Sequence, residues 1–274
     1  MRTIRTTFGK LFGASLARVV GHQLTVAAAA LATIVTVATG MRPVYMGREP
    51  IVKRLVVAAS AAEDSSATDA RSRAPWALLA SPDSAIGSQQ FQADRQAFVV
   101  DLVATGHVAP ARAESLATFA VREAYRKRVP PALVFGVLVT ENNTFRSRAR
   151  SNVGAVGLMQ VHRKVWVPTL GKLFGRDLHD DETNLRYGVH ILSANLYASA
   201  ARALTAEGAL SRGLLRYNGC VRGTNTRGCH RYPAKVRRAV ERFAVAQCAD
   251  GGYAKCVEEP IRLSIAAGEV VATR

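Results

Sequence analysis

One glutamate lies where its surroundings would give a carboxyl group acid chemistry. Residues 131–140 read PALVFGVLVT, are almost entirely apolar, and are followed directly by Glu141. Pro130 and Pro131 favour the start of a helix here, because proline fits the first helical turn. A carboxyl group at the C-terminal end of an apolar helix meets a hydrophobic wall and the negative pole of the helix dipole, and both favour its protonated form. Glu141 is therefore a candidate general acid.

A glycine-containing segment follows and offers groups suited to a sugar. Residues 151–160 read SNVGAVGLMQ, and the two glycines permit a tight turn and a close approach of the backbone. We expect Leu158 to enter the core, and Met159 and Gln160 to face outward as an adaptable apolar group beside an amide. A sugar with an N-acetyl group presents an apolar face and hydrogen-bonding atoms, so this pair predicts a glycan contact.

The order of these motifs along the chain resembles a known family. An Asp-x-Glu-x-Asn helix start lies at 180–184, Leu-Arg-Tyr-Asn-Gly at 215–219 and Tyr-Pro-Ala-Lys-Val at 232–236. Together with Glu141 and the Gly-x-x-Gly-Leu-Met-Gln segment, they resemble the lytic transglycosylases of the soluble-transglycosylase (SLT) type, whose catalytic domain is related to goose-type lysozyme. The resemblance covers residues 112–245, about half of the chain.

The resemblance implies a role for each matching residue. Glu141 would be the catalytic acid and base, with no metal or cofactor. The positions that would contact the substrate are Met159, Gln160, Tyr217, Asn218 and Tyr232. Among them, the two amides would bind the glycan and Met159 would line its groove. Tyr217 is similar to the tyrosine whose hydroxyl lies near the acid and the reacting sugar, and Tyr232 matches a groove-lining position.

The resemblance also implies a reaction that needs one carboxyl group. Glu141 would protonate the glycosidic oxygen between N-acetylmuramic acid and N-acetylglucosamine in peptidoglycan, while the 2-acetamido oxygen of the substrate stabilises C1. The same glutamate would then accept the proton of the C6 hydroxyl as a 1,6-anhydro ring closes. The alternatives are hydrolysis of the lysozyme type, and a wall-binding component of an envelope-spanning machine with little catalysis.

Glycosidases ordinarily place two carboxyl groups around the scissile bond. The nearest acidic cluster here is Asp180, Asp181 and Glu182, just before a helix expected from Asn184. Carboxylates at that place are typical of helix capping and of the first helical turn, where they complement the dipole. We therefore expect a structural role for this cluster.

The segment after the glutamate departs from the family's pattern. The family usually has serine next and phenylalanine three residues after the glutamate, whereas here Asn142 follows and the aromatic residue is Phe145. The usual proline and threonine after Leu-Met-Gln are replaced by His-Arg-Lys-Val at 162–165, and Arg216 stands where a small alanine often occurs. The sequence predicts an altered loop beside the acid, longer by one residue.

Helical periodicity dominates the chain around these motifs. The expected helices are 92–105, 111–128, 130–142, 184–201, 206–217 and 233–247. Apolar residues at Leu116, Phe119, Ala120 and Ala124 share one face of the second helix, and alternating strand patterns with turn signals are absent. The sequence predicts a mainly α, lysozyme-like catalytic domain over 93–250, with a C-terminal tail at 251–274.

The N-terminal part suggests a link to a membrane. A basic lead at 1–18 precedes 19–41, of which Leu24–Met41 carries no charge, and the whole run is just long enough to span a bilayer. The alternatives are a signal peptide cleaved near Met41 and a buried core helix. An Ala/Ser/Asp-rich linker follows at 42–92. We expect a bacterial envelope protein, anchored in the inner membrane with its catalytic domain in the periplasm, or exported after cleavage.

All four cysteines lie late in the chain, and they allow three pairings. The sequence-local arrangement joins Cys220 to Cys229 and Cys248 to Cys256, and an exported location favours disulfides. The alternative is a zinc site formed by the first two cysteines with His230, although its spacing matches no common metal pattern. Three further histidines are expected to lie on the surface or in helices, outside the reaction: His162, His179 and His190.

The net charge of +17 comes from 37 basic and 20 acidic residues in a chain of 274. With 49% hydrophobic residues this is an ordinary globular composition, which excludes a collagen, a coiled coil or a disulfide miniprotein. Such a charge favours an anionic partner. Nucleic acid is not expected, because the bases are dispersed and no recognition motif is present. With Glu141 the favoured partner is the peptidoglycan strand, which a basic groove would concentrate.

Overall fold

The computed structural model describes residues 82–200, 205–220 and 228–272. The predicted basic lead at 1–18, the predicted membrane or signal segment at 19–41 and most of the predicted linker at 42–92 lie outside these ranges. Within them, no helix has the length and apolar character needed to cross a membrane.

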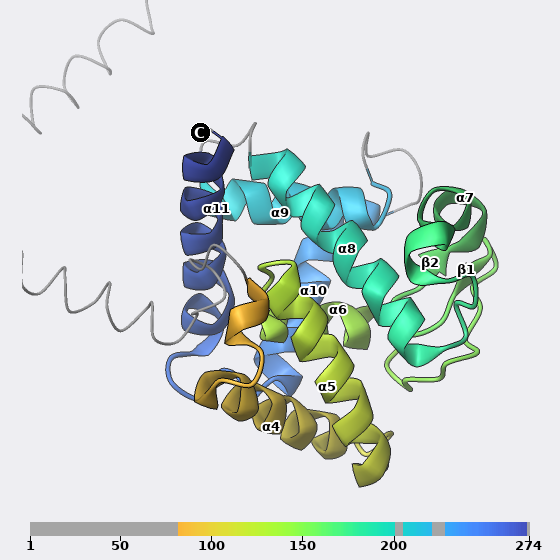
Figure 1. Ribbon diagram of the computed structural model, residues 1–274, viewed down its shortest axis with the longest axis horizontal. Helices are drawn as coiled ribbons and strands as arrows, with labels where there is room; N and C mark the ends of the chain where they lie inside the picture. The colour runs from red at the N-terminus through yellow and green to blue at the C-terminus, as the bar shows by residue number, and fades with distance from the viewer. Residues whose placement is uncertain (1–81, 201–204, 221–227, 273–274) are drawn as a thin grey trace, which may run out of the picture. The chain divides into compact units, whose positions relative to one another are not determined.

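The described chain is mainly helical, as the sequence predicts (Figure 1). Its α-helices are α4 (Gln89–Ala104), α5 (Pro110–Arg126), α6 (Pro131–Glu141), α7 (Arg163–Phe174), α8 (Asp181–Ala200), α9 (Ala206–Tyr217), α10 (Tyr232–Phe243) and α11 (Glu259–Ala272). Shorter helical turns are η1 (Pro82–Ala85), η2 (Cys229–Arg231) and η3 (Ala254–Glu258). The strands are β1 (Ala155–Val156) and β2 (Val161–His162).

Helix α6 lies in the centre of the core. All of its side chains from Pro131 to Val139 are buried, as expected for a helix that is apolar on every side. It packs against α5 and α10. At Gly136 the contact with α10 is closest, because a Cβ atom there would lie 2.4 Å from a methyl group of Val240. This close packing holds the last residue of the helix, Glu141, beside α10.

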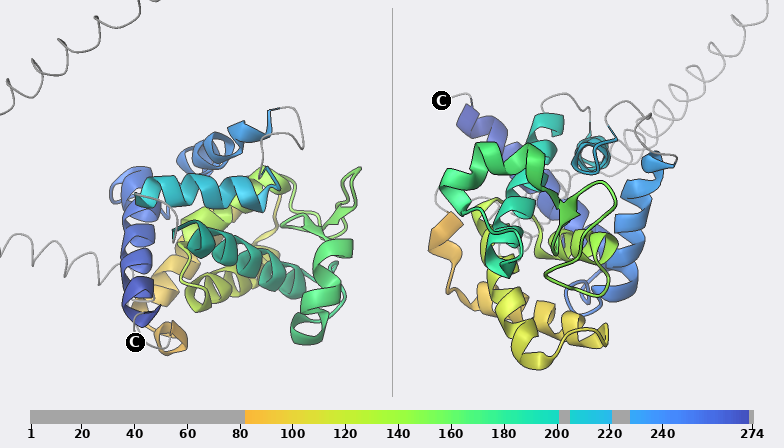
Figure 2. Two further views of the ribbon diagram at one scale, coloured as in Figure 1. Left: turned by 90° about the horizontal axis from the view of Figure 1, so that it is seen from above. Right: turned by 90° about the vertical axis from the view of Figure 1, so that its right-hand side faces the viewer.

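Helices α5 and α8 are joined by a buried carboxylate. Glu123 of α5 is 2% exposed and has guanidinium groups of Arg126 at 3.0 Å and Arg186 at 3.7 Å. A buried carboxylate is stable in a core only when such partners compensate its lost hydration. Helix α9 packs against α8 and crosses it at an angle (Figures 1 and 2), and Gly213 lets the two backbones meet at Leu196.

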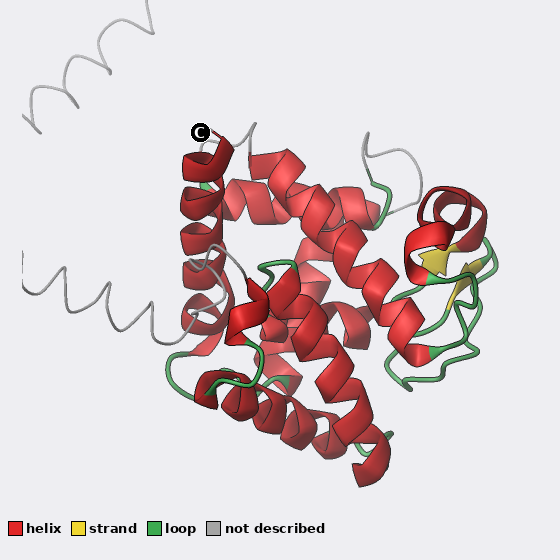
Figure 3. Ribbon diagram, in the orientation of Figure 1, coloured by secondary structure: helices red, strands yellow, loops and turns green. Residues whose placement is uncertain are grey.

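A small lobe of two short strands and α7 stands beside the helices (Figure 3). The strands are antiparallel, with Ala155 opposite His162 and Val156 opposite Val161. The sequence predicts neither the strands nor α7. Strands of two residues are too short to show alternation, and α7 contains Pro168, which disfavours a helical interior. This lobe carries the SNVGAVGLMQ segment.

The helical fold extends past both predicted boundaries of the 93–250 domain. At its N-terminal side Ser88 caps α4 by accepting a hydrogen bond from a backbone N–H of the first turn. Beyond residue 250, η3 and α11 replace the predicted tail, and Tyr253, Val257 and Ile261 are buried in the common core. The predicted helix at 233–247 is correct in place but ends at Phe243.

Both disulfides have the sequence-local arrangement, Cys220–Cys229 and Cys248–Cys256. The first joins the end of α9 to η2, just before α10. The second closes the turn that leads into η3 and α11. Because Cys220 and Cys229 are bonded to each other, their thiols are not available as the zinc ligands of the alternative prediction.

Candidate active site

Glu141 meets a tyrosine from a distant part of the chain. It is the last residue of α6, and Tyr232 is the first residue of α10, whose hydroxyl donates a hydrogen bond of 2.5 Å to its Oε1 atom. Burial raises the pKa of Glu141 to about 6, while the Tyr232 hydrogen bond and the charge of Lys235 act in the opposite direction. The carboxyl group is thus poised to donate a proton near neutral pH.

A second tyrosine, Tyr217, packs against Tyr232. The rings of Tyr217 and Tyr232 are stacked, with centroids 6.5 Å apart and planes inclined by 26°. The hydroxyl of Tyr217 donates to the carbonyl oxygen of Met159 at 2.8 Å. Burial and the charge of Glu141 raise the pKa of both tyrosines, so both hydroxyls stay protonated. Tyr232 is therefore the direct partner of the acid, and Tyr217 joins that pair to the lobe.

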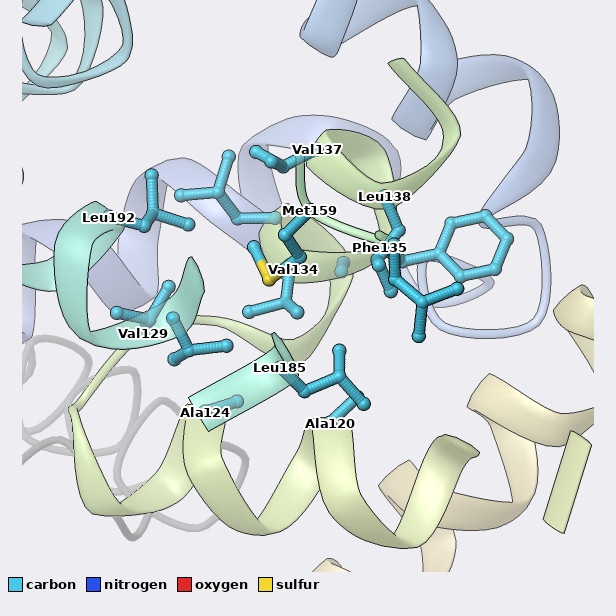
Figure 4. Packing of buried hydrophobic residues seen from close by; sticks show 14 of the residues in the cluster. Ala120, Ala124, Val129, Val134, Phe135, Val137, Leu138, Met159, Leu185 and Leu192 are labelled. Carbon is cyan, nitrogen blue, oxygen red and sulfur yellow. The ribbon is translucent and has the colours of Figure 1, made fainter. Parts of the chain in front are cut away.

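The predicted outward position of Met159 is wrong. Its side chain is fully buried, and Figure 4 shows it among Val134, Leu185 and Leu192. The space comes from Gly188 of α8, where a Cβ atom would lie 2.2 Å from the methionine sulfur. Met159 therefore belongs to the core and does not line a groove. Leu158 is buried as predicted.

The two amide side chains predicted to contact the substrate, Gln160 and Asn218, are accessible to solvent. Gln160 is half-buried, has a positive φ of 48°, and donates from Nε2 to the carbonyl oxygen of Gly157 at 2.8 Å. Asn218 is exposed and is the C-cap residue that follows Tyr217 at the end of α9. The fold thus leaves both side chains within reach of a ligand.

Asn184 fixes the lobe to α8, a role that the sequence analysis missed. Its Oδ1 atom accepts from the backbone N–H of Met159 at 2.9 Å, and its Nδ2 atom donates to the carbonyl oxygens of Val156 and Leu178, each at 2.9 Å. The side chain is 1% exposed. At Gly157 a Cβ atom would lie 2.1 Å from this amide, so only glycine fits. The asparagine in the Asp-x-Glu-x-Asn motif was the available signal.

Asn142 organises the loop after the acid. It is 6% exposed and donates to the carbonyl oxygens of Arg146 at 2.8 Å and Gly157 at 3.2 Å. Its Oδ1 atom also accepts from the N–H of Arg146 at 3.2 Å. Phe145 takes a φ of 51° and is buried, so its side chain fixes the loop to the core. The side chain of Asn142 is thus hydrogen-bonded to backbone groups and anchors the loop.

The acidic cluster at the start of α8 has the structural role that was predicted. Asp180 accepts a hydrogen bond from the backbone N–H of Thr183 at 2.8 Å, which caps the helix. Asp181 pairs with Arg112 at 3.1 Å and Glu182 pairs with Arg122 at 2.5 Å. No carboxylate is among the groups that shift the pKa of Glu141 within the described residues. The side chains that act on the pKa of the acid are thus those of Tyr232 and Lys235.

Comparison with known proteins agrees with this reading of the chain. No curated protein and no solved structure matches it. One family model does, over residues 119–225, and its description is Transglycosylase SLT domain. The matched range begins in α5, includes Glu141 and the lobe, and ends shortly after Tyr217 and Asn218. Residues 119–225 of this chain thus match the transglycosylase SLT domain family, which confirms the resemblance found in the sequence.

Proposed function

We propose that the protein cleaves the β-1,4 bond between N-acetylmuramic acid and N-acetylglucosamine in peptidoglycan without consuming water. The observation that carries this proposal is the Glu141 carboxyl group, half-buried at the end of an apolar helix and hydrogen-bonded to Tyr232. Its raised pKa suits the donation of a proton to a glycosidic oxygen. The match to the SLT family gives the substrate class.

The reaction proceeds in two steps that use one carboxyl group. First, Glu141 donates its proton to the glycosidic oxygen, the bond from that oxygen to C1 breaks, and the 2-acetamido oxygen forms a bond to C1. Second, the Glu141 carboxylate takes the proton of the C6 hydroxyl, whose oxygen bonds to C1 as the acetamido oxygen leaves. The glutamate is protonated again, and the products are an N-acetylglucosamine 4-hydroxyl and a 1,6-anhydro-N-acetylmuramic acid.

The surroundings of the acid support a single-carboxylate scheme. A second carboxylate close enough to act as a nucleophile would raise the pKa of Glu141 by like-charge repulsion. The charge that acts on Glu141 is instead that of Lys235, and the acidic cluster at 180–182 is engaged in capping and ion pairs. Stabilisation of C1 by the substrate's own acetamido group is consistent with this arrangement.

A substitution of the acid tests the proposal. Wild type and Glu141→Gln are incubated with purified sacculi, and Glu207→Gln, which changes an exposed glutamate of α9, is the matched control. Wild type and the control release 1,6-anhydromuropeptides, and Glu141→Gln releases none although it binds the sacculi. Release by Glu141→Gln at the wild-type rate contradicts the assignment of the acid.

Localisation follows from the proposed substrate. Peptidoglycan lies outside the bacterial inner membrane, so the domain acts in the cell envelope, held there by the segment at 19–41 or released after its cleavage. Two disulfides within the domain are consistent with an oxidising compartment. A complex that spans the envelope needs a component that opens the wall locally. Association of this protein with such a complex is therefore part of the proposal.

A further inference from the structure

A shallow groove of about 710 Å³ runs along the outer face of α10 next to the end of α6. Val139 and Thr140 of α6 and Asn143 of the following loop form one side of it. The residues that line it from α10 include Lys235, Arg238 and Arg242. Its floor is apolar, because Val139 and Ala239 are buried there and the ring of Phe243 lies against the guanidinium of Arg242 at 5.0 Å.

The three cations of this groove share one face of the helix. They lie at spacings of three and four residues along α10, which is the spacing of neighbours on a helix surface. All three side chains are exposed. Within the ranges that the structure describes, none forms an ion pair, whereas the neighbouring Arg237 pairs with Glu241 at 2.8 Å and thereby engages the one carboxylate that lines the groove.

The groove begins beside the catalytic acid. Thr140 and Asn143 flank Glu141 in sequence, and Lys235 both lines the groove and acts by its charge on the Glu141 carboxyl group. A glycan strand with its scissile bond at Glu141 therefore carries the substituents of the reacting sugars toward α10. In stem-bearing glycan the lactyl carboxyl group of N-acetylmuramic acid is amide-linked to the peptide, so the sugars themselves are neutral and the carboxylates that three cations would attract lie on the stem.

We propose that this groove binds the peptide stem of the N-acetylmuramic acid at the cleavage site, with Arg238 and Arg242 holding stem carboxylates. This inference rests on the proposed function. Guanidinium groups bind carboxylates through paired hydrogen bonds, and the apolar floor suits aliphatic side chains of a peptide. A stem is covalently attached next to the bond that Glu141 cleaves, so it reaches the groove without a separate binding event. The protein accordingly prefers glycan strands that carry stems over bare glycan.

The test compares two substrates with one pair of variants. Purified sacculi supply stem-bearing glycan, and amidase treatment of the same material supplies stem-free glycan. For the double variant Arg238→Gln/Arg242→Gln, the ratio of kcat/KM on stem-bearing glycan to kcat/KM on stem-free glycan falls about tenfold, the loss expected for charge-assisted hydrogen bonds. The matched control Lys172→Gln/Arg262→Gln removes two exposed charges that do not line the groove, and it leaves the ratio unchanged. An unchanged ratio in the groove variant, or an equal fall in the control, overturns the inference.

A binding measurement separates this inference from the proposed function. In the Glu141→Gln background, calorimetry measures the affinity for a disaccharide–tetrapeptide and for the same disaccharide without peptide. The groove predicts tighter binding of the peptide-bearing compound, and loss of that preference in the Arg238→Gln/Arg242→Gln background. If the wild-type protein cleaves neither glycan while this preference is present, the proposed reaction is refuted and the inference that the groove binds the stem is supported. If the preference is absent, the inference that the groove binds the stem is refuted, whatever the outcome of the cleavage assay.

Discussion

Glu141 and Tyr232 lie 91 positions apart in the sequence, yet the tyrosine hydroxyl donates to the carboxyl group across 2.5 Å. The contact depends on three features of the fold. Gly136 lets α10 pack closely on α6, the Cys220–Cys229 disulfide precedes α10 and ties it to α9, and Tyr217 stacks on the tyrosine ring. A hydrogen bond to the ionised form favours that form, so Tyr232 limits how far burial raises the pKa of the acid.

Tyr232→Phe raises the pKa of Glu141 further, because it removes a hydrogen bond that lowers that pKa. We expect the alkaline limb of the pH profile of kcat/KM to move to higher pH, since the acid stays protonated longer. We also expect kcat to fall about tenfold or more, as a charge-assisted hydrogen bond that positions the acid is lost. A pH profile of the purified variant measures both. A limb that stays in place or moves to lower pH would contradict the role given to Tyr232.

Glu141→Gln stabilises the fold at alkaline pH. In wild type the pKa of Glu141 is raised from 4.5 to about 6, so folding favours the protonated acid, and this contribution is present below pH 4.5 and lost as pH rises through about 6. The neutral amide removes that dependence. The free energy of unfolding of the variant should exceed that of wild type by up to about 2 kcal/mol at pH 8, and by little at pH 4. The pKa of Asp94 is also raised to about 6, but Asp94 is present in both proteins, so its contribution to the pH dependence of stability cancels in the comparison. Urea unfolding at the two pH values checks this, and a variant less stable than wild type at pH 8 would refute it.

Asn184→Ala detaches the lobe from α8. It leaves one backbone N–H and two carbonyl oxygens without their buried partner, so we expect the free energy of unfolding to fall by about 3 kcal/mol. Asn152→Ala, at an exposed position of the same lobe region, is the control and should change it by less than about 0.5 kcal/mol. Urea denaturation curves for the two variants provide the measurement. Equal effects would mean that Asn184 is not the anchor.

Met159→Ala reports on the core rather than on substrate binding. Removal of this buried side chain should lower the free energy of unfolding by about 2 to 5 kcal/mol. At a temperature where the variant remains folded, KM for peptidoglycan should stay near the wild-type value, because the side chain does not reach the surface. Gly188→Ala should be destabilising as well, since its Cβ atom would meet the methionine. A large rise in KM without a loss of stability would contradict this prediction and would indicate that Met159 contacts the glycan.

The sequence was sufficient for those parts of the site that depend on local patterns. The apolar run before Glu141 predicts a buried helix with an acid at its end, and Leu158 enters the core as its motif indicates. Asp180 caps α8, and Asp181 and Glu182 lie in its first turn, as the place of this acidic cluster suggests. These features depend on residues close to one another in the chain.

The remaining features of the site depend on contacts between distant elements. The sequence does not show that Gly188 of α8 leaves room for Met159, so the side chain was predicted on the wrong side of its segment. The partner of the acid is similarly determined by how α6 and α10 pack, which places Tyr232 rather than Tyr217 on the carboxyl group. The roles of Asn142 and Asn184 escaped prediction because a buried amide and an exposed amide look alike in a sequence.

The cleavage proposed for Glu141 consumes no water. Mass spectrometry of the soluble products from purified peptidoglycan tests it most directly, with the full wild-type chain as catalyst. We expect muropeptides that end in 1,6-anhydro-N-acetylmuramic acid, each lighter by one water than the corresponding reducing sugar. Products with reducing N-acetylmuramic acid ends would contradict it and would make the protein a hydrolase of the lysozyme type.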